Sequence, residues 1–162
     1  MRTHGLLCLA LLAVAACAGD RMNTSSRQDD FRRDYAGGML CTADPCTVKI
    51  TVAAGCTATV DPPTLGVDRT LSEVTVKWEI QAQSAGRVVF VAAPADGINP
   101  KPPPGPWNAE FKRPNRASDT VFTWLDKNKL NGGQLRRRHD YNIDMTQDGT
   151  ACHVDPIIIN DY

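Results

Sequence analysis

The feature that most constrains the fold is a strict alternation of apolar and polar residues over residues 74–82. The apolar positions are Val74, Val76, Trp78, Ile80 and Ala82, and Thr75, Lys77, Glu79 and Gln81 lie between them. Side chains along a β-strand point to alternate faces, so a period of two predicts a strand that is buried on one face. The pattern leaves little room for a helix.

Six other segments have strand character: residues 48–52, 56–60, 87–93, 121–125, 141–145 and 154–159. Residues 87–93 are apolar on both faces, which is typical of a central strand. Pro156 predicts that the last segment is an edge strand or is bulged, because proline has no N–H to donate. About seven to eight strands separated by turn signals, without a sustained helical period, predict an all-β sandwich with little helix.

The first 16 residues read as an export signal. Arg2 gives a basic start, and residues 6–16 form an unbroken apolar run that ends directly before Cys17. A spanning helix needs about 20 apolar residues, so this run is too short to cross a membrane. The segment Val14-Ala15-Ala16-Cys17 resembles the lipobox of bacterial lipoprotein signal peptides.

The resemblance implies that Cys17 becomes the lipidated first residue of the mature protein. Ala18 follows it, and the lack of aspartate at that place implies transfer to the outer membrane, facing the periplasm. One alternative stays open, an ordinary secretory signal with cleavage elsewhere; translation from Met22 is discounted, because it would make the apolar run of residues 6–16 a coincidence.

The rest of the chain divides into two expected regions. Residues 17–38 include a polar, charged stretch with almost no aliphatic residues, which predicts a lipidated N-terminus followed by a flexible tether. As a coil, the tether would hold the domain on the order of 25 Å from the bilayer. The sandwich domain is expected to occupy residues 39–162.

The cysteines of this domain are Cys41, Cys46, Cys56 and Cys152, an even number that predicts two disulfides in an exported protein. A straight strand over residues 47–53 would separate Cys46 from Cys56 by more than about 20 Å. A disulfide needs Cα atoms within about 7 Å. We therefore favour Cys41–Cys46 with Cys56–Cys152, and Cys41–Cys56 with Cys46–Cys152 stays open.

Residues 48–52, 76–80 and the Cys-x-x-Asp-Pro of residues 152–156 loosely resemble cupredoxin-like and immunoglobulin-like sandwiches of exported bacterial proteins. Blue-copper members need two histidines, a cysteine and usually an axial methionine. In that family a histidine and then a methionine follow shortly after the cysteine. Here His153 follows Cys152 directly and no later His or Met is present, so no copper, other metal or cofactor is expected.

The remaining candidates for chemistry are His139 beside Asp140, and His153 near Asp155, as metal ligands or as a base with its orienting carboxylate. Neighbouring residues on a strand point to opposite faces, so His139 and Asp140 should not converge. Solvated histidines at strand ends are expected instead. No catalytic residue is assigned, and a metal-binding or enzymatic role through His139 and His153 is kept as the alternative.

A long connection over residues 95–118 holds a proline-rich stretch and a large aromatic residue, and residues 136–139 form the densest basic cluster. These segments are expected to form a partner surface, because loops on a rigid scaffold often carry function. A solvated insertion and a solvated turn are the plainer alternatives. The expected surface residues are Trp107, Lys112, Arg113, Arg116, Arg136, Arg137 and Arg138.

The formal net charge of the chain is zero, which argues against a nucleic-acid partner. The expected partners are the membrane, through the lipid, and an envelope protein or an anionic polysaccharide. The expected function is therefore non-enzymatic binding or scaffolding at the cell envelope, and the sequence does not indicate an oligomeric state.

Overall fold

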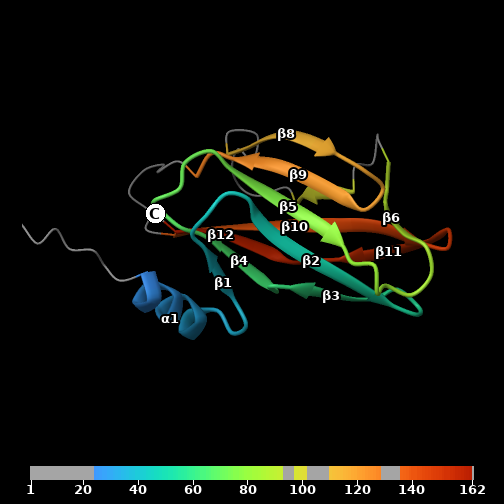
Figure 1. Ribbon diagram of the computed structural model, residues 1–162, viewed down its shortest axis with the longest axis horizontal. Helices are drawn as coiled ribbons and strands as arrows, with labels where there is room; N and C mark the ends of the chain where they lie inside the picture. Colours follow the sequence, from blue (N-terminus) through green and yellow to red (C-terminus); the bar gives the residue numbers. More distant parts are fainter. Residues whose placement is uncertain (1–23, 93–96, 102–109, 129–135, 162) are drawn as a thin grey trace, which may run out of the picture.

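The computed structural model describes residues 24–92, 97–101, 110–128 and 136–161, which form one helix and twelve strands (Figure 1). The helix is α1 (Thr24–Asp34). The strands are β1 (Met39–Cys41), β2 (Cys46–Ala53), β3 (Thr57–Asp61), β4 (Thr64–Val67), β5 (Val74–Ile80), β6 (Val88–Phe90), β7 (Ile98–Pro100), β8 (Phe111–Arg116), β9 (Val121–Asp126), β10 (Arg136–Gln147), β11 (Thr150–Val154) and β12 (Ile157–Asp161). They make two mixed sheets, which confirms the all-β sandwich.

The smaller sheet has five strands in the order β3-β2-β5-β9-β8. Its central strand, β5, alternates strictly between buried and half-buried positions, as the sequence predicts. Strand β2 alternates in the same way and lies parallel to β5, whereas β9 is antiparallel to it. The inward faces of these strands supply one half of the core.

The larger sheet has the path β1-β4-β12-β10-β11, with β6 and β7 also paired to β10. Strands β11 and β12 form one continuous arm opposite β10, since Asp140 pairs with Ile157 and Ile143 with Val154 in the same register. A two-residue turn joins β10 to β11, and its residues Asp148 and Gly149 both have positive φ, 50° and 85°. That conformation matches the twist of a hairpin.

Two strand expectations need correction. Pro156 does interrupt the arm, between β11 and β12, but β12 lies inside the sheet between β10 and β4 rather than at an edge. Residues 87–93 do not form a central strand: β6 spans only Val88–Phe90 and, among the described strands, pairs with β10 alone. The predicted seven to eight strands are too few, because short segments such as β1, β4 and β7 have too few residues to show a period.

The core between the sheets is closed by large side chains from both of them. Trp78 of β5 and Phe122 of β9 pack against Phe90 and Tyr141 of the larger sheet with edge-to-face ring contacts. The indole Nε1 of Trp78 donates a hydrogen bond of 3.0 Å to the Tyr141 hydroxyl. All four side chains are buried, so this bond joins the two sheets away from water.

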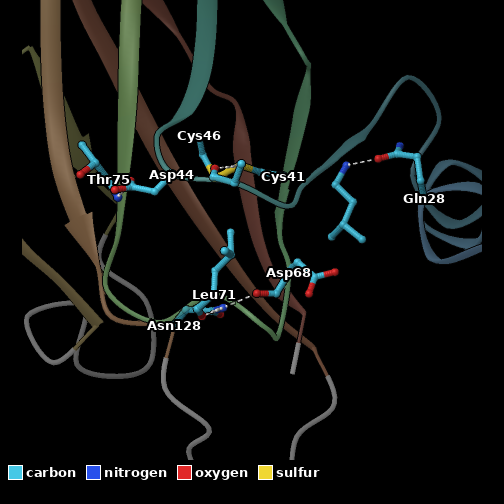
Figure 2. The surroundings of a disulfide bond; sticks show 10 residues. Gln28, Cys41, Asp44, Cys46, Asp68, Leu71, Thr75 and Asn128 are labelled. Atoms are coloured by element: carbon cyan, nitrogen blue, oxygen red, sulfur yellow. Dashed lines mark hydrogen bonds between the residues drawn. A yellow bond between two sulfur atoms is a disulfide. The ribbon is translucent and has the colours of Figure 1, made fainter. Parts of the chain in front are cut away.

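Both disulfides of the favoured pairing are present. Cys41–Cys46 joins the end of β1 to the start of β2, with a Cα separation of 5.6 Å (Figure 2). Cys56–Cys152 ties the turn before β3 to β11 across the side of the sandwich, with a Cα separation of 5.2 Å. Each bridge therefore connects one sheet to the other.

The expectation of a flexible tether over residues 17–38 is wrong in part, because residues 24–34 within it form α1. Phe31 of α1 is fully buried against Leu40 and Ile159 on the outside of the larger sheet, and Tyr35 packs beside it. A helix of this length is marginal in isolation and is held by packing, so local sequence gives little sign of it. Within the described residues, no helix is long and apolar enough to cross a membrane.

Candidate functional site: a buried polar cluster at one end of the sandwich

Three polar side chains are enclosed between the sheets at the end where β9 and β12 finish. Glu110 directly precedes β8, Asp126 ends β9 and Asn160 lies in β12. Their exposed fractions are 1%, 0% and 0%. The Asn160 side-chain amide donates to Glu110 Oε1 at 3.0 Å and to Asp126 Oδ1 at 3.2 Å. We call these residues the Asp126 cluster; in it a single amide bridges the two sheets.

Asp126 is the residue whose acidity is most changed by this site. Burial raises the pKa of Asp126 to about 7, and the nearby charge of Glu110 acts in the same direction. Hydrogen bonds from the Asn128 backbone N–H, at 2.9 Å, and from the Asn160 amide oppose the rise only in part. The second oxygen, Oδ2, has no hydrogen-bond partner among the described residues. Asp126 therefore titrates near neutral pH.

Hydrogen bonds extend this polar region towards α1. The Asn128 side-chain amide donates to the backbone oxygens of Asp68 and Leu71, each at 2.8 Å (Figure 2). The buried carboxylate of Asp68 in turn forms an ion pair with Arg27 of α1 at 2.6 Å. Burial alone would raise the pKa of Asp68, but hydrogen bonds from Thr70 and the charge of Arg27 outweigh it, and the pKa is lowered.

The geometry limits what the Asp126 cluster can do. A carboxyl group that titrates near pH 7 has the acidity of a general acid or base. A base must also reach its substrate, and Glu110, Asp126 and Asn160 are closed off from solvent. In this conformation the Asp126 carboxyl lies between the sheets and is not presented to a ligand.

The structure places His139 next to this end, in the interior. Its exposed fraction is 3%, and its ring meets Phe111 edge to face with centroids 4.9 Å apart. The expectation of a solvated His139 is therefore wrong: position 139 shares the inward face of β10 with Tyr141. Asp140 points the other way and accepts a 2.6 Å hydrogen bond from Arg138, so the predicted divergence of His139 and Asp140 is confirmed.

His153 lies on the outer face of the larger sheet, between two carboxylates. Its Nδ1 is 2.7 Å from Asp144 Oδ1 and its Nε2 is 2.7 Å from Asp155 Oδ1. Lys101 also contacts Asp155, at 3.1 Å. The hydrogen bond to Asp144 is the largest cause of a raised pKa for His153. Asp155 was a sequence candidate; Asp144 was missed, because it is brought opposite His153 only by the register of β10 and β11.

The two candidate histidines do not share a site. His139 faces the interior, whereas the His153 side chain is 49% exposed on the outer surface. In the part of the chain that the structure describes, no group of three or more His, Cys, Asp or Glu side chains is arranged to hold a metal ion.

The first half of the expected partner surface lies along β8, an edge strand. Trp107 lies outside the described residues. Lys112 and Arg113 are exposed, and a register irregularity follows Lys112. Arg116 is half-buried and forms an ion pair with Asp119 at 2.6 Å, so part of its charge is neutralised locally.

Sequence reasoning missed Lys127, which adjoins these cations. The pKa of Lys127 is lowered, first by a side-chain hydrogen bond with Lys112 and then by desolvation and by the charge of Lys112. The charges of Glu73 and Glu110 act in the opposite direction. Lys112, Arg113 and Lys127 form what we call the basic patch. The pairing of β8 with β9 creates it, and the sequence spacing of residues 112 and 127 does not reveal it.

The second half of the expected surface is less convergent. Arg136 and Arg137 begin β10, and their side chains lie outside what the structure describes. Arg138 is exposed and paired with Asp140. The structure therefore does not bring Arg138 into the basic patch through any described contact.

Comparison with known proteins adds no family to these observations. No protein-family model matches the chain, and no curated protein matches it.

Proposed function

We propose that this chain is a lipid-anchored protein of the bacterial cell envelope whose β-sandwich is a non-enzymatic binding or scaffolding module. The observation that carries the proposal is that Cys41, Cys46, Cys56 and Cys152 form two disulfides, each joining one sheet to the other. Disulfides persist in oxidising compartments, so this pairing supports export. The lipobox-like segment before Cys17, outside the described residues, supports an anchor in the outer membrane, facing the periplasm.

The anchor is tested by Cys17→Ser in the full chain, followed by fractionation of cells and labelling with a radioactive fatty acid. We expect the variant to lose the label and to leave the membrane fraction or to remain unprocessed. Cys8→Ser, inside the apolar run, is the matched control and should keep both label and location. A mature-sized Cys17→Ser protein that stays in the membrane fraction would refute the anchor.

The basic patch is the surface that we propose for a partner, an anionic envelope polysaccharide. The side chains of Lys112 and Lys127 lie within hydrogen-bonding reach of each other, so one bound carboxylate or phosphate could accept hydrogen bonds from both. Arg113 adds a planar donor suited to the same groups, and it is exposed. An exposed edge strand rich in cations is also a common defence against aggregation, so the binding role needs a direct test.

That test is calorimetric titration of the full chain with a carboxylated polysaccharide at low and at physiological salt. We expect binding that weakens with salt and falls at least tenfold in the double variant Lys112→Glu/Lys127→Glu. Lys49→Glu, at an exposed lysine of β2, is the control and should bind as the wild type does. If Lys112→Glu/Lys127→Glu binds the polysaccharide as well as Lys49→Glu does, the basic patch is not the binding site. If crosslinking in cells from position 113 captures a protein, the partner is a protein and not a polysaccharide.

A further inference from the structure

We infer that α1 is a releasable strap that sets how far the sandwich can stand from the membrane. The inference rests on the proposed lipid at Cys17. With α1 docked, six residues (18–23) separate the lipid from the helix, a reach of at most about 20 Å. With α1 released, 21 residues (18–38) separate it from β1, a reach of at most about 70 Å.

The contacts of α1 are separate from the main core. On β12, Ile158 faces the interior, whereas Ile157 and Ile159 face outward towards Phe31. Strand β1 divides in the same way, because Leu40 packs with Phe31 and its neighbour in the chain joins the interior. Figure 1 shows α1 beside β1, outside the two sheets. Release of α1 would therefore leave the packing between the sheets in place.

The seat for Phe31 is shaped by two glycines. A Cβ added to Gly66 would lie 2.6 Å from ring carbons of Phe31, and one added to Gly38 would lie 2.8 Å from the same ring. Non-bonded carbon atoms do not approach each other this closely, so any side chain at Gly66 would displace the ring. The close approach of Phe31 to β4 depends on the missing side chain.

Two polar contacts complete the docking. Arg27 forms the ion pair with buried Asp68 at the end of the sandwich. Gln28 Oε1 accepts a 2.9 Å hydrogen bond from the backbone N–H of Leu40, on β1, the outermost strand of its sheet (Figure 2). An edge strand with open N–H groups invites pairing by other chains, so α1 also covers this edge.

The helix has little stability of its own. It spans only 11 residues and carries no acidic residue in its first turn, so only the C-terminal end, with Arg32 and Arg33 in the last turn, has charges that favour it. Helix formation and docking are therefore coupled, and loss of the Phe31 contact should release the whole segment. Segments with few buried contacts open locally without global unfolding.

The first experiment measures hydrogen exchange in the unlipidated full chain, Cys17→Ser. Adding Gly66→Ala should raise amide exchange in α1 at least tenfold and leave exchange in β5 unchanged. Phe31→Ala, which removes the ring without adding an atom, should do the same. Arg33→Ala is the control, because Arg33 is an exposed residue of α1 whose described ion pairs are to Asp30 and Asp34 of the same helix. Unchanged exchange in α1, or equal increases in α1 and β5, would overturn the strap.

The second experiment measures reach, with the lipidated chain in vesicles that carry an acceptor dye in the lipid. A donor dye at position 150, an exposed residue beside the far-end turn, should transfer energy less efficiently in Gly66→Ala than in the wild type or Arg33→Ala. Suppose that the wild type and Gly66→Ala differ in α1 exchange but transfer energy equally. The inference that release of α1 lengthens the connection between lipid and sandwich would then be wrong. A chain that is not lipidated at Cys17 would refute the proposed anchor instead, and the exchange experiment would still test the docking of α1.

Discussion

The side-chain amide of Asn160 in β12 donates a 3.2 Å hydrogen bond to the carboxylate of Asp126 in β9, across the interface between the two sheets. The same amide also donates to Glu110 Oε1. Two buried carboxyl groups thus share one amide group, and this end of the sandwich is joined by polar contacts. Its stability should therefore depend on whether Asp126 holds a proton.

Replacing Asp126 with asparagine should remove a pH dependence of stability. The folded pKa of Asp126, about 7, lies above its ordinary value of 3.8, so the folded state holds the proton more tightly. This contribution is complete below about pH 4 and is lost as the pH rises through 7. In the wild type the free energy of unfolding should fall by up to about 1.4 kcal/mol per pH unit in that window.

Urea unfolding at pH 5, 6, 7 and 8, followed by tryptophan fluorescence, measures this slope. Asp126→Asn should show a flatter profile, and Asp29→Asn, at an exposed residue of α1, should behave as the wild type does. If the Asp126→Asn profile is as steep as that of the wild type, another group carries the dependence.

The two disulfides should differ in their contribution to stability. Cys56–Cys152 joins residues 96 positions apart and Cys41–Cys46 joins residues five apart. In the chain-entropy account, the longer loop is worth about 4–5 kcal/mol and the shorter one about 2 kcal/mol. Paired serine variants, compared by denaturant unfolding, should therefore rank Cys56→Ser/Cys152→Ser as the less stable. The reverse order would mean that native packing decides the effect.

The ring of His153 should titrate above the ordinary histidine range. Its two nitrogens lie against Asp144 and Asp155, and both carboxylates favour the charged ring. Nuclear magnetic resonance of the imidazole during a pH titration should give a raised pKa. Asp144→Asn should lower it more than Asp155→Asn, because the Asp144 hydrogen bond is the larger cause. Since the folded pKa is the higher one, the small stabilisation is present at low pH and is lost as the pH rises through it.

Tyr141→Phe should destabilise the fold by about 1–3 kcal/mol, because it leaves the buried Trp78 N–H without its acceptor. The measurement is chemical unfolding, with Trp78→Phe and the double variant completing a cycle. We expect the two substitutions to be strongly non-additive, since either one removes the same hydrogen bond. Additive effects would show that the bond contributes little.

The sequence predicts the sandwich well where burial on one face imposes a period, as in β5, and where covalent geometry restricts choices, as for the cysteines. It does not predict α1, because a helix seated by Phe31 on Gly66 depends on a contact 35 positions away in the chain. No local period records such a contact. Short strands such as β1 are not predicted for the same reason, because only their pairing with distant strands identifies them.

The candidate site divides in the same way. In β9, Asp126 falls on the same alternating positions as Phe122 and Trp124, and His139 falls on the same face of β10 as Tyr141. The sequence alternation therefore indicates that both Asp126 and His139 point inward. The alternation does not reveal which residue of the other sheet lies opposite. The contact between Asn160 and Asp126 forms only when the two sheets pack together.

The bridge between Cys56 and Cys152 makes a covalent ring of most of the chain. A protease that cuts once at any peptide bond between these two cysteines opens the ring without dividing the molecule. The two pieces would stay together on a non-reducing gel and separate only after reduction. Backbone cleavage within this ring would therefore leave the protein as one physical object, still attached to whatever holds its N-terminus.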